Sequence, residues 1–311
     1  MDKLIMSAGP HIHSANSSRR IMLDVIIALL PAAIASVVLF GMKALAMIVT
    51  TVAAAVASEY LFNVITKHEQ TAGDLSAVVT GLLLALNLST NVELWQCAVG
   101  AVFAIVLVKC VFGGIGKNFA NPAITGRVFM LLAFESVAGG ALPKLADAVS
   151  GATPLEELGA NGLANMPQLM DMLLGIRGGA IGEGCIAALL IGFIYLLCRG
   201  VIKWHIPVIF IGTVFVCYLI ATGDAMFSLY EILAGGLFIG AIFMATDYVT
   251  SPISTGGRAL FALGCGLITF VIRYFCAYPE GVSFSILIMN LLAPGLEKLT
   301  PNKPLGGSKH G

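Results

Sequence analysis

IMLDVIIALLPAAIASVVLF, residues 21–40, is a run of mostly apolar side chains that carries a single charge, Asp24. A stretch of about 20 apolar residues is long enough to cross the hydrocarbon core of a bilayer as a helix. Because backbone polar groups in lipid must be satisfied internally, and no strand-like alternation competes, such runs indicate helices. Nine more apolar segments follow, at residues 44–66, 75–90, 94–112, 121–137, 181–199, 205–222, 229–246, 257–276 and 282–298. The sequence therefore predicts an all-α polytopic membrane protein with about ten transmembrane helices.

The composition agrees with this class of protein. Hydrophobic residues make up 58% of the 311 residues and charged residues 11%, and the mean hydropathy is +0.95. The formal net charge is zero, which argues against a nucleic-acid partner, because phosphate binding needs clustered Lys and Arg. The seven cysteines lie in or beside apolar runs without a C-x-x-C pair, a pattern unlike that of zinc or iron–sulfur ligands.

The distribution of Lys and Arg predicts the orientation in the membrane, because cytoplasmic loops carry the excess of positive charge. With ten crossings and a cytoplasmic N-terminus, the external loops hold only Lys43, Lys144 and Arg177. The cytoplasmic regions then hold Lys3, Arg19, Arg20, Lys67, Lys117, Arg199, Lys203, Arg258, Lys298, Lys303 and Lys309. Both termini are thus expected in the cytoplasm. Two segments can be broken or re-entrant helices instead of full crossings. They are the short segment 75–90 and the segment 229–246, which ends in a polar turn.

The expected organisation has five parts: a cytoplasmic tail (1–20), five helices (21–137), an extracytoplasmic loop (138–180), five further helices (181–298) and a cytoplasmic tail (299–311). The two halves resemble each other. GLLLAL at residues 81–86 parallels GLFIGA at 236–241, and a glycine stands nine residues before Lys109 as another does before Arg273. Five crossings per half is an odd number, so a true repeat must be inverted, as in transporters with midplane sites. Chance similarity between glycine-rich helices is the alternative.

GGIGKNFANPA, residues 113–123, joins two of these segments. It lacks the Walker spacing and a preceding strand, which excludes a nucleotide phosphate loop. Asn121 before Pro122 is typical of a helix start, with Asn as the cap and Pro at the first helical position. Asn118 has no such explanation. The two amides are also suited to hydrogen bonding with a heteroaromatic ring such as isoalloxazine, and both interpretations stay open.

Ionisable residues inside apolar segments are costly and raise a functional question. One set lies near segment ends, where water or headgroups would solvate it: Asp24, Glu59, Glu93 and Glu297. A second set lies deeper, and its members can pair with one another, pair with partner subunits or line an ion path: Lys109, Arg127, Glu135, Asp247 and Arg273. The sequence does not choose among these roles.

DAVSGATP, residues 147–154, interrupts the apolar pattern with small side chains. The Thr153 hydroxyl is expected to be accessible there on flexible backbone. A threonine hydroxyl is a weak nucleophile without a base nearby, and residues 138–180 contain no His. Thr153 is therefore a better substrate for a modifying enzyme than a catalyst, although the tetrapeptide SGAT is also typical of a turn or helix cap.

The motif Asp147-x-x-Ser150-Gly151-Ala152-Thr153 resembles the flavinylation motif of the B subunit of the sodium-pumping NADH:quinone oxidoreductase and of the related D subunit of the Rnf complex. Three further stretches are similar to signatures of the same family: GGIGKNFANPA at 113–123, MATDYVTSP at 244–252 and AYPEG at 277–281. The short polar N-terminus favours the Rnf protein over the quinone-reductase protein.

This resemblance implies FMN joined through its phosphate to Thr153 by a flavin transferase that uses FAD. Asp147, Ser150, Gly151 and Ala152 are then recognition residues. It also implies non-covalent riboflavin in the membrane, with Asn118 and Asn121 matching the asparagines associated with it.

The expected function is that of a bacterial inner-membrane flavoprotein subunit, which couples electron transfer between ferredoxin and NAD to Na⁺ or H⁺ transport. Its expected partners are the other Rnf subunits, including a second flavinylated subunit and iron–sulfur subunits, and no catalytic residue or turnover is expected in this chain alone. The alternatives are the quinone-reductase B subunit and, from another class, a channel or transporter similar in fold to urea transporters. A channel has no use for an exposed flavin attachment loop.

Overall fold

The computed structural model describes residues 17–137, 143, 153–164, 166–276 and 280–301. Within these ranges the chain forms helices joined by turns, with no β-strand. The first half contains α1 (Ser18–Phe40), α2 (Met42–Thr66), η1 (Ala72–Asp74), α3 (Ser76–Leu86), α4 (Leu94–Val102), the π-helix η2 (Phe103–Cys110), α5 (Pro122–Ala133) and η3 (Glu135–Val137). Next come α6 (Pro154–Asn161) and α7 (Leu169–Leu174). The second half contains α8 (Ile186–Cys198), α9 (His205–Thr222), α10 (Ala225–Leu233), α11 (Leu237–Ile239), the π-helix η4 (Gly240–Met244), α12 (Thr255–Phe275) and α13 (Val282–Leu299).

Each of the ten apolar segments overlaps a helix, and the all-α polytopic membrane class is confirmed. Five helices in the described part of the chain, α1, α2, α9, α12 and α13, are long and apolar enough to cross a membrane. The segment 229–246 is broken as expected: α10 and the unit formed by α11 and η4 meet at 67°. Helix α3 has only 11 residues. The count of ten crossings and the five-part organisation stay predictions.

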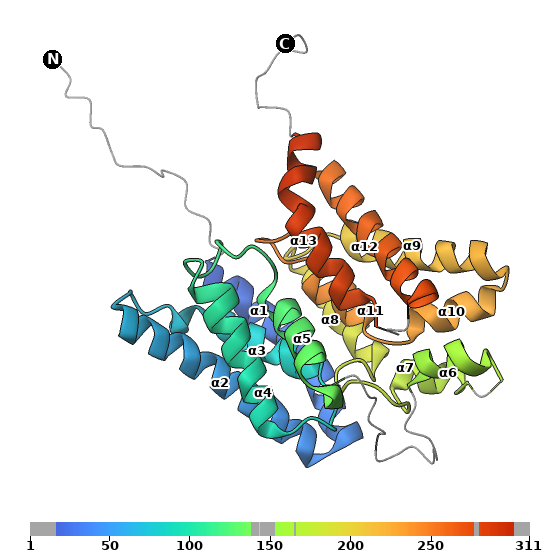
Figure 1. Cartoon of the computed structure of the whole chain (residues 1–311), viewed down its shortest axis with the longest axis horizontal. Helices are drawn as coiled ribbons and strands as arrows, with labels where there is room; N and C mark the ends of the chain where they lie inside the picture. Colours follow the sequence, from blue (N-terminus) through green and yellow to red (C-terminus); the bar gives the residue numbers. More distant parts are fainter. Residues whose placement is uncertain (1–16, 138–142, 144–152, 165, 277–279, 302–311) are drawn as a thin grey trace, which may run out of the picture.

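The helices form two groups that lie side by side, α1–α5 and α8–α13 (Figure 1). A close contact recurs in both groups. A Cβ on Gly100 of α4 would lie 2.7 Å from the Met130 sulfur of α5, and a Cβ on Gly264 of α12 would lie 2.6 Å from the Met289 sulfur of α13. Both glycines allow a methionine to pack against a helix backbone, as small residues do in membrane helix pairs. This matched contact is what a repeat predicts, while the repeat and its inversion stay predictions.

The largest apolar core joins the two groups. It gathers buried side chains from α1, α3, α8, α9, η4, α12 and α13, among them Leu29, Leu86, Phe210 and Phe261. Helices α1 and α8 approach closely because Gly192 lies against the backbone of Ala28. The pocket described below therefore lies between two packed groups of helices.

Candidate functional site

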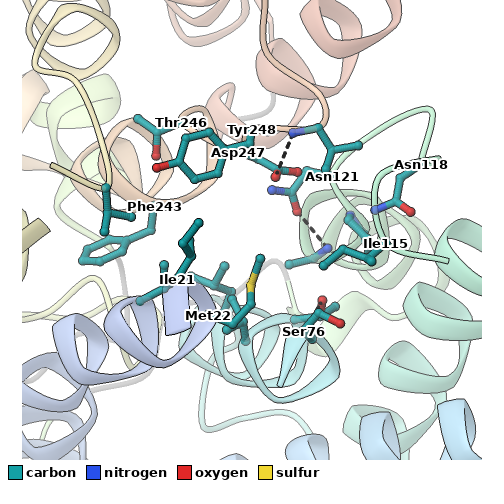
Figure 2. A pocket seen from close by; sticks show the side chains of 18 of the residues that line it. Ile21, Met22, Ser76, Ile115, Asn118, Asn121, Phe243, Thr246, Asp247 and Tyr248 are labelled. Carbon is teal, nitrogen blue, oxygen red and sulfur yellow. Dashed lines mark hydrogen bonds between the residues drawn. The ribbon is translucent and has the colours of Figure 1, made fainter. Parts of the chain in front are cut away.

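A pocket opens where the two helix groups meet (Figure 2). Its empty space is about 770 Å³, the open mouth included. Its walls come from α1, α3, η2, the loop 113–123, the C-terminal end of α8 with the turn after it, and the turn that follows η4. The pocket brings together Asn118, Asn121, Lys109 and Asp247, four residues that the sequence singled out in separate segments. Its remaining lining is mostly apolar, as is typical of cofactor pockets.

Asn121 has a structural role in this pocket. Its Oδ1 accepts hydrogen bonds from the backbone N–H groups of Ala123 (3.0 Å) and Ile124 (3.3 Å), which caps α5, with Pro122 at the first helical position. Its Nδ2 donates to the Met244 carbonyl of η4 at 3.2 Å. The cap predicted from the sequence is confirmed, and the same side chain ties the two helix groups together.

Asn118 differs from Asn121. Its side chain is half-buried and lines the pocket, and its Oδ1 is buried without a hydrogen-bond partner among the described residues. Buried polar atoms are almost always paired, so each exception calls for an explanation. An acceptor left open beside an apolar pocket is suited to a ligand that carries an N–H or O–H group.

Asp247 lies in the turn after η4. Its Oδ1 accepts from the Val249 N–H at 3.3 Å, and its Oδ2 accepts from the Thr250 hydroxyl at 3.1 Å. Burial raises the pKa of the Asp247 carboxyl above its ordinary value, although these two hydrogen bonds partly oppose the shift. The carboxylate is thus held on the pocket wall without a cationic partner among the residues described.

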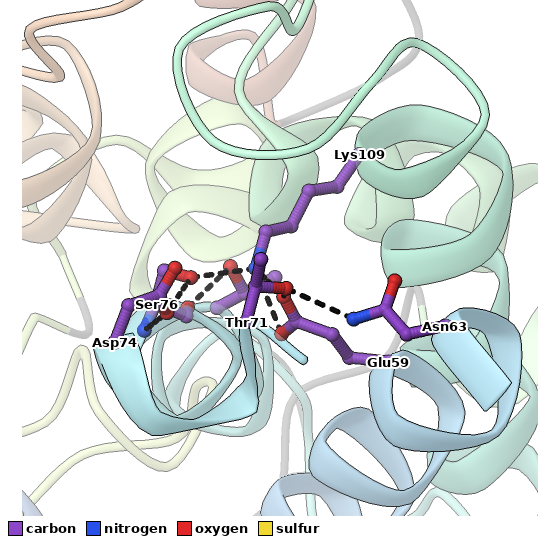
Figure 3. A network of polar contacts seen from close by, with 7 residues as sticks. Glu59, Asn63, Thr71, Asp74, Ser76 and Lys109 are labelled. Carbon is purple, nitrogen blue, oxygen red and sulfur yellow. Dashed lines mark hydrogen bonds and ion pairs between the residues drawn. The ribbon is translucent and has the colours of Figure 1, made fainter. Parts of the chain in front are cut away.

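Lys109 belongs to a polar network on the first group of helices (Figure 3). Its ammonium lies 2.8 Å from both carboxylate oxygens of Glu59 and 2.5 Å from the Ser76 hydroxyl. Glu59 also accepts from Thr71 at 2.6 Å, and Ser76 donates to Asp74 at 2.5 Å. Ser76 and Lys109 both line the pocket, so the network reaches its wall.

The expectation that water or headgroups solvate Glu59 is wrong. Glu59 is fully buried because α3 and η2 cover this part of α2, and Lys109 supplies the countercharge. Asp24 is also buried, and its partners are Arg199 at 3.2 Å and the Tyr195 hydroxyl at 2.9 Å. The distance of a residue from the end of its segment does not predict its burial, because burial depends on which neighbouring helices pack over that residue.

A second buried cluster surrounds Arg127 of α5. The guanidinium contacts Asn87 at the end of α3, Glu183 before α8 (3.0 Å) and Glu280 before α13. Glu183 and Glu280 were not identified from the sequence. Glu183 lies inside the apolar segment 181–199. Because a charged residue inside such a segment indicates a candidate functional site, Glu183 could have been identified from the sequence.

Arg273 lies elsewhere, against α10. Its Nη1 donates to the Glu231 carbonyl at 2.7 Å and lies 3.5 Å from the Glu231 carboxylate, and its Nη2 donates to the Ala234 carbonyl at 3.3 Å. Glu135 is in the short helix η3. Of the five ionisable residues expected deep within apolar segments, the structure brings together Lys109 and Asp247, which share the pocket. Arg127 and Arg273 are held by other partners.

Thr153 is the N-cap of α6. Its hydroxyl accepts from the Glu156 N–H at 3.3 Å, the Glu156 carboxylate accepts from the Thr153 N–H at 2.8 Å, and Pro154 follows at the first helical position. The side chain is half-buried, so Thr153 is held by a capping box rather than by a loose loop. The predicted recognition residues Asp147, Ser150, Gly151 and Ala152 lie outside the described residues.

Comparison with known proteins gives a match along nearly the whole chain. A model of the NQR2, RnfD, RnfE family matches residues 5–306. The D subunit of the Na⁺-translocating ferredoxin:NAD⁺ oxidoreductase complex of Acetobacterium woodii is 43% identical over 309 residues, which are 98% of this chain and 96% of that protein. The D subunit of the proton-translocating ferredoxin:NAD⁺ oxidoreductase complex of Clostridium ljungdahlii is 40% identical, over 95% of this chain and 94% of that protein. The chain belongs to the NQR2, RnfD, RnfE family.

Proposed function

We propose that this chain is the flavin-carrying D subunit, located in the bacterial cytoplasmic membrane, of an Rnf-type, ion-translocating ferredoxin:NAD oxidoreductase complex. The observation that carries the proposal is the near full-length similarity to the D subunits of two such complexes. The family also contains NQR2, but both of these relatives are named for ferredoxin and NAD. One is named as Na⁺-translocating and the other as proton-translocating, so the proposal covers either ion.

The proposal includes FMN carried on Thr153. In the attachment step the Thr153 oxygen loses its proton and forms a bond to the FMN phosphorus of FAD, while the pyrophosphate bond breaks and AMP leaves. The geometry supports this chemistry, because the oxygen caps α6 as an acceptor and an ester oxygen keeps a lone pair for that hydrogen bond. The N-terminus of a helix also favours a nearby phosphate anion.

A non-covalent riboflavin in the pocket between the helix groups is the second part of the proposal. The pocket has mostly apolar walls with a few convergent polar groups, as is typical of cofactor pockets. The unpartnered Oδ1 of Asn118 would accept from an N–H or O–H of the flavin, and the apolar walls would exclude water from the ring. Asn121 would act indirectly, since its Oδ1 caps α5 and its Nδ2 donates to the Met244 carbonyl.

In this proposal the flavins supply the electron transfer, while the protein binds them and sets their surroundings. Turnover requires the partner subunits, namely the second flavinylated subunit and the iron–sulfur subunits. The chain by itself would hold cofactors without catalysing a net reaction.

Flavin attachment is tested by producing the chain with its flavin transferase, denaturing it and examining the gel band for flavin fluorescence. We expect a bright band for the wild type, a dark band for Thr153→Val and a retained band for Thr153→Ser, which keeps both the hydroxyl and the cap. A dark wild-type band, or a Thr153→Val band as bright as the wild type, would contradict the attachment.

The place in the complex is tested in inverted membrane vesicles. Vesicles from cells with the gene should reduce NAD⁺ with reduced ferredoxin and take up Na⁺ or acidify, and vesicles from a deletion strain should do neither. Retained ferredoxin-dependent activity in the deletion strain, or loss of NADH:quinone activity alone, would instead favour the quinone-reductase alternative.

A further inference from the structure

A second cavity lies beside α6, the helix that Thr153 caps. It is enclosed by α6, by α10 and by the C-terminal end of α12, elements that are neighbours in Figure 1. Its empty space is about 700 Å³, open mouth included, and its lining residues are Leu155, Glu156, Gly159, Ala160, Glu231, Arg273 and Cys276. The cavity volume without the open mouth is about 340 Å³. This value is near the lower end of the range for ligand pockets, roughly 300 to 1,000 Å³.

The cavity is within reach of a group attached to Thr153. The Thr153 hydroxyl oxygen is 3.3 Å from the backbone nitrogen of Glu156, a lining residue. Gly159 and Ala160 line the cavity one turn further along α6. At about 1.5 Å of rise per residue, Ala160 is about 10 Å along the helix axis from Thr153, a span suited to a phosphoribityl chain followed by a flat ring.

Two buried polar side chains leave hydrogen-bonding atoms open in the cavity wall. The Arg273 side chain is only 1% exposed and that of Glu231 only 6%. In the described part of the chain, Nε of Arg273 and Oε2 of Glu231 are buried without a hydrogen-bond partner. Oε2 has a long ion-pair contact, 3.5 Å, with Nη1 of the same Arg273. The wall therefore offers one donor and one acceptor, and a ligand that satisfies both must itself carry an acceptor and a donor.

Gly159 leaves the α6 side of the cavity flat. A Cβ at this position would meet no atom of the described residues within 4 Å, so these residues leave the space beside the helix open. Glycine inside a helix costs about 1 kcal/mol relative to alanine, yet α6 has one here. A planar ligand lying along α6 would make use of this absent side chain.

We propose that this cavity seats the isoalloxazine ring of the flavin carried on Thr153, with the Arg273 Nε–H donating to a ring acceptor and the Glu231 carboxylate accepting from the ring N–H. The proposal rests on the proposed attachment at Thr153. It gives Arg273 the role of positioning the flavin. From the sequence, Arg273 was expected to pair with another residue or to line an ion path. Gly159, which has no side chain, leaves room for the planar ring beside α6.

Cys276 allows a direct test, because it is exposed and lines the cavity. Cys198 serves as the control, because it is also exposed but lies at the end of α8 and does not line the cavity. The full chain is purified with and without attached flavin, the latter as Thr153→Val, and treated with a maleimide; mass spectrometry gives the alkylation rate of each cysteine. A seated ring that covers most of its pocket should slow Cys276 about five- to tenfold relative to Thr153→Val. Cys198 should react equally in both proteins.

Gly159→Leu provides a second variant, which places an apolar side chain in the cavity and favours the helix. Its Cβ would meet no atom of the described residues within 4 Å. In this background the ratio of Cys276 rates with and without attached flavin should fall to about one, because the ring is displaced. A bright wild-type gel band with equal Cys276 rates in the wild type and Thr153→Val would overturn the seating proposal alone. A dark wild-type band would instead contradict the attachment itself.

Discussion

Asn118 and Asn121 stand three residues apart in one glycine-rich loop, yet the protein uses their side chains differently. Asn121 satisfies backbone N–H groups of α5 and a carbonyl of η4, whereas Asn118 leaves its Oδ1 open at the pocket. The difference arises because only Asn121 directly precedes Pro122, which fixes the start of the helix. Identical residue types in one motif can thus serve stability and ligand binding separately.

This contrast predicts opposite effects of two matched substitutions. Asn121→Ala removes a helix cap and should lower thermal stability by about 0.5–2 kcal/mol. Asn118→Ala should leave stability nearly unchanged but reduce the flavin that is released on denaturation without covalent attachment. Thermal unfolding in detergent and flavin extraction measure the two effects. Equal loss of stability in both variants, with flavin content unaffected, would show that Asn118 has no binding role.

The Glu59–Lys109 pair gives a second prediction at the residue level. Both side chains are buried, so removing one charge leaves the other uncompensated, at a cost of about 3–5 kcal/mol. Lys109→Met or Glu59→Gln should therefore destabilise the protein strongly, and the double variant should lose less than the two single variants together. Thermal unfolding of the wild type, the two single variants and the double variant gives a double-mutant cycle, which measures the coupling between the two charges. Simple additivity would show that the two charges are solvated independently.

Among the helices, close packing depends on a few glycines, as the contact between α1 and α8 illustrates. Gly192 of α8 lies against the backbone of Ala28 and also near Phe243 of η4. A Cβ there would displace the two helices, because neither backbone can yield locally. Gly212 of α9 is the opposite case, since a Cβ there would have no atom within 4 Å in the part of the chain that the structure describes.

Alanine at these two positions should separate packing from helix propensity. Gly192→Ala should destabilise by about 1–3 kcal/mol through overpacking. Gly212→Ala should be neutral or stabilise by up to about 1 kcal/mol, because alanine favours the helix. Melting temperatures of the purified variants give the comparison. If Gly192→Ala were as stable as Gly212→Ala, α1 and α8 would have to be less closely packed than in the structure.

For the whole molecule, the asymmetry of Lys and Arg predicts that the segment carrying Thr153 and the loop after α8 face opposite sides of the membrane. Reporter fusions after Gly162 and after Lys203 test this, since alkaline phosphatase is active outside the cytoplasm and a fluorescent protein inside it. We expect phosphatase activity at the first position and fluorescence at the second. The same side for both fusions would mean that the segment 181–199, the one predicted crossing between them, does not cross the membrane.

Much of the architecture was predictable from hydropathy, including the ten apolar segments and the break within 229–246. The cap at Asn121 was predictable because it depends on local sequence alone. The carboxylates of Glu183 and Glu280 were missed, since their burial depends on α5 bringing Arg127 between them. Likewise the solvated role expected for Glu59 failed because Lys109, 50 residues away, covers and pairs it.

The sequence by itself determined the membrane class, the positions of the helices and the family, because hydropathy, capping and family signatures are encoded in short stretches of chain. Only the tertiary structure decided which polar residues share a site: it placed Asn118, Lys109 and Asp247 around one pocket, and Arg273 and Glu231 around a cavity beside α6. These residues lie far apart in sequence. Their meeting depends on how the two helix groups pack, a long-range property that local patterns do not record.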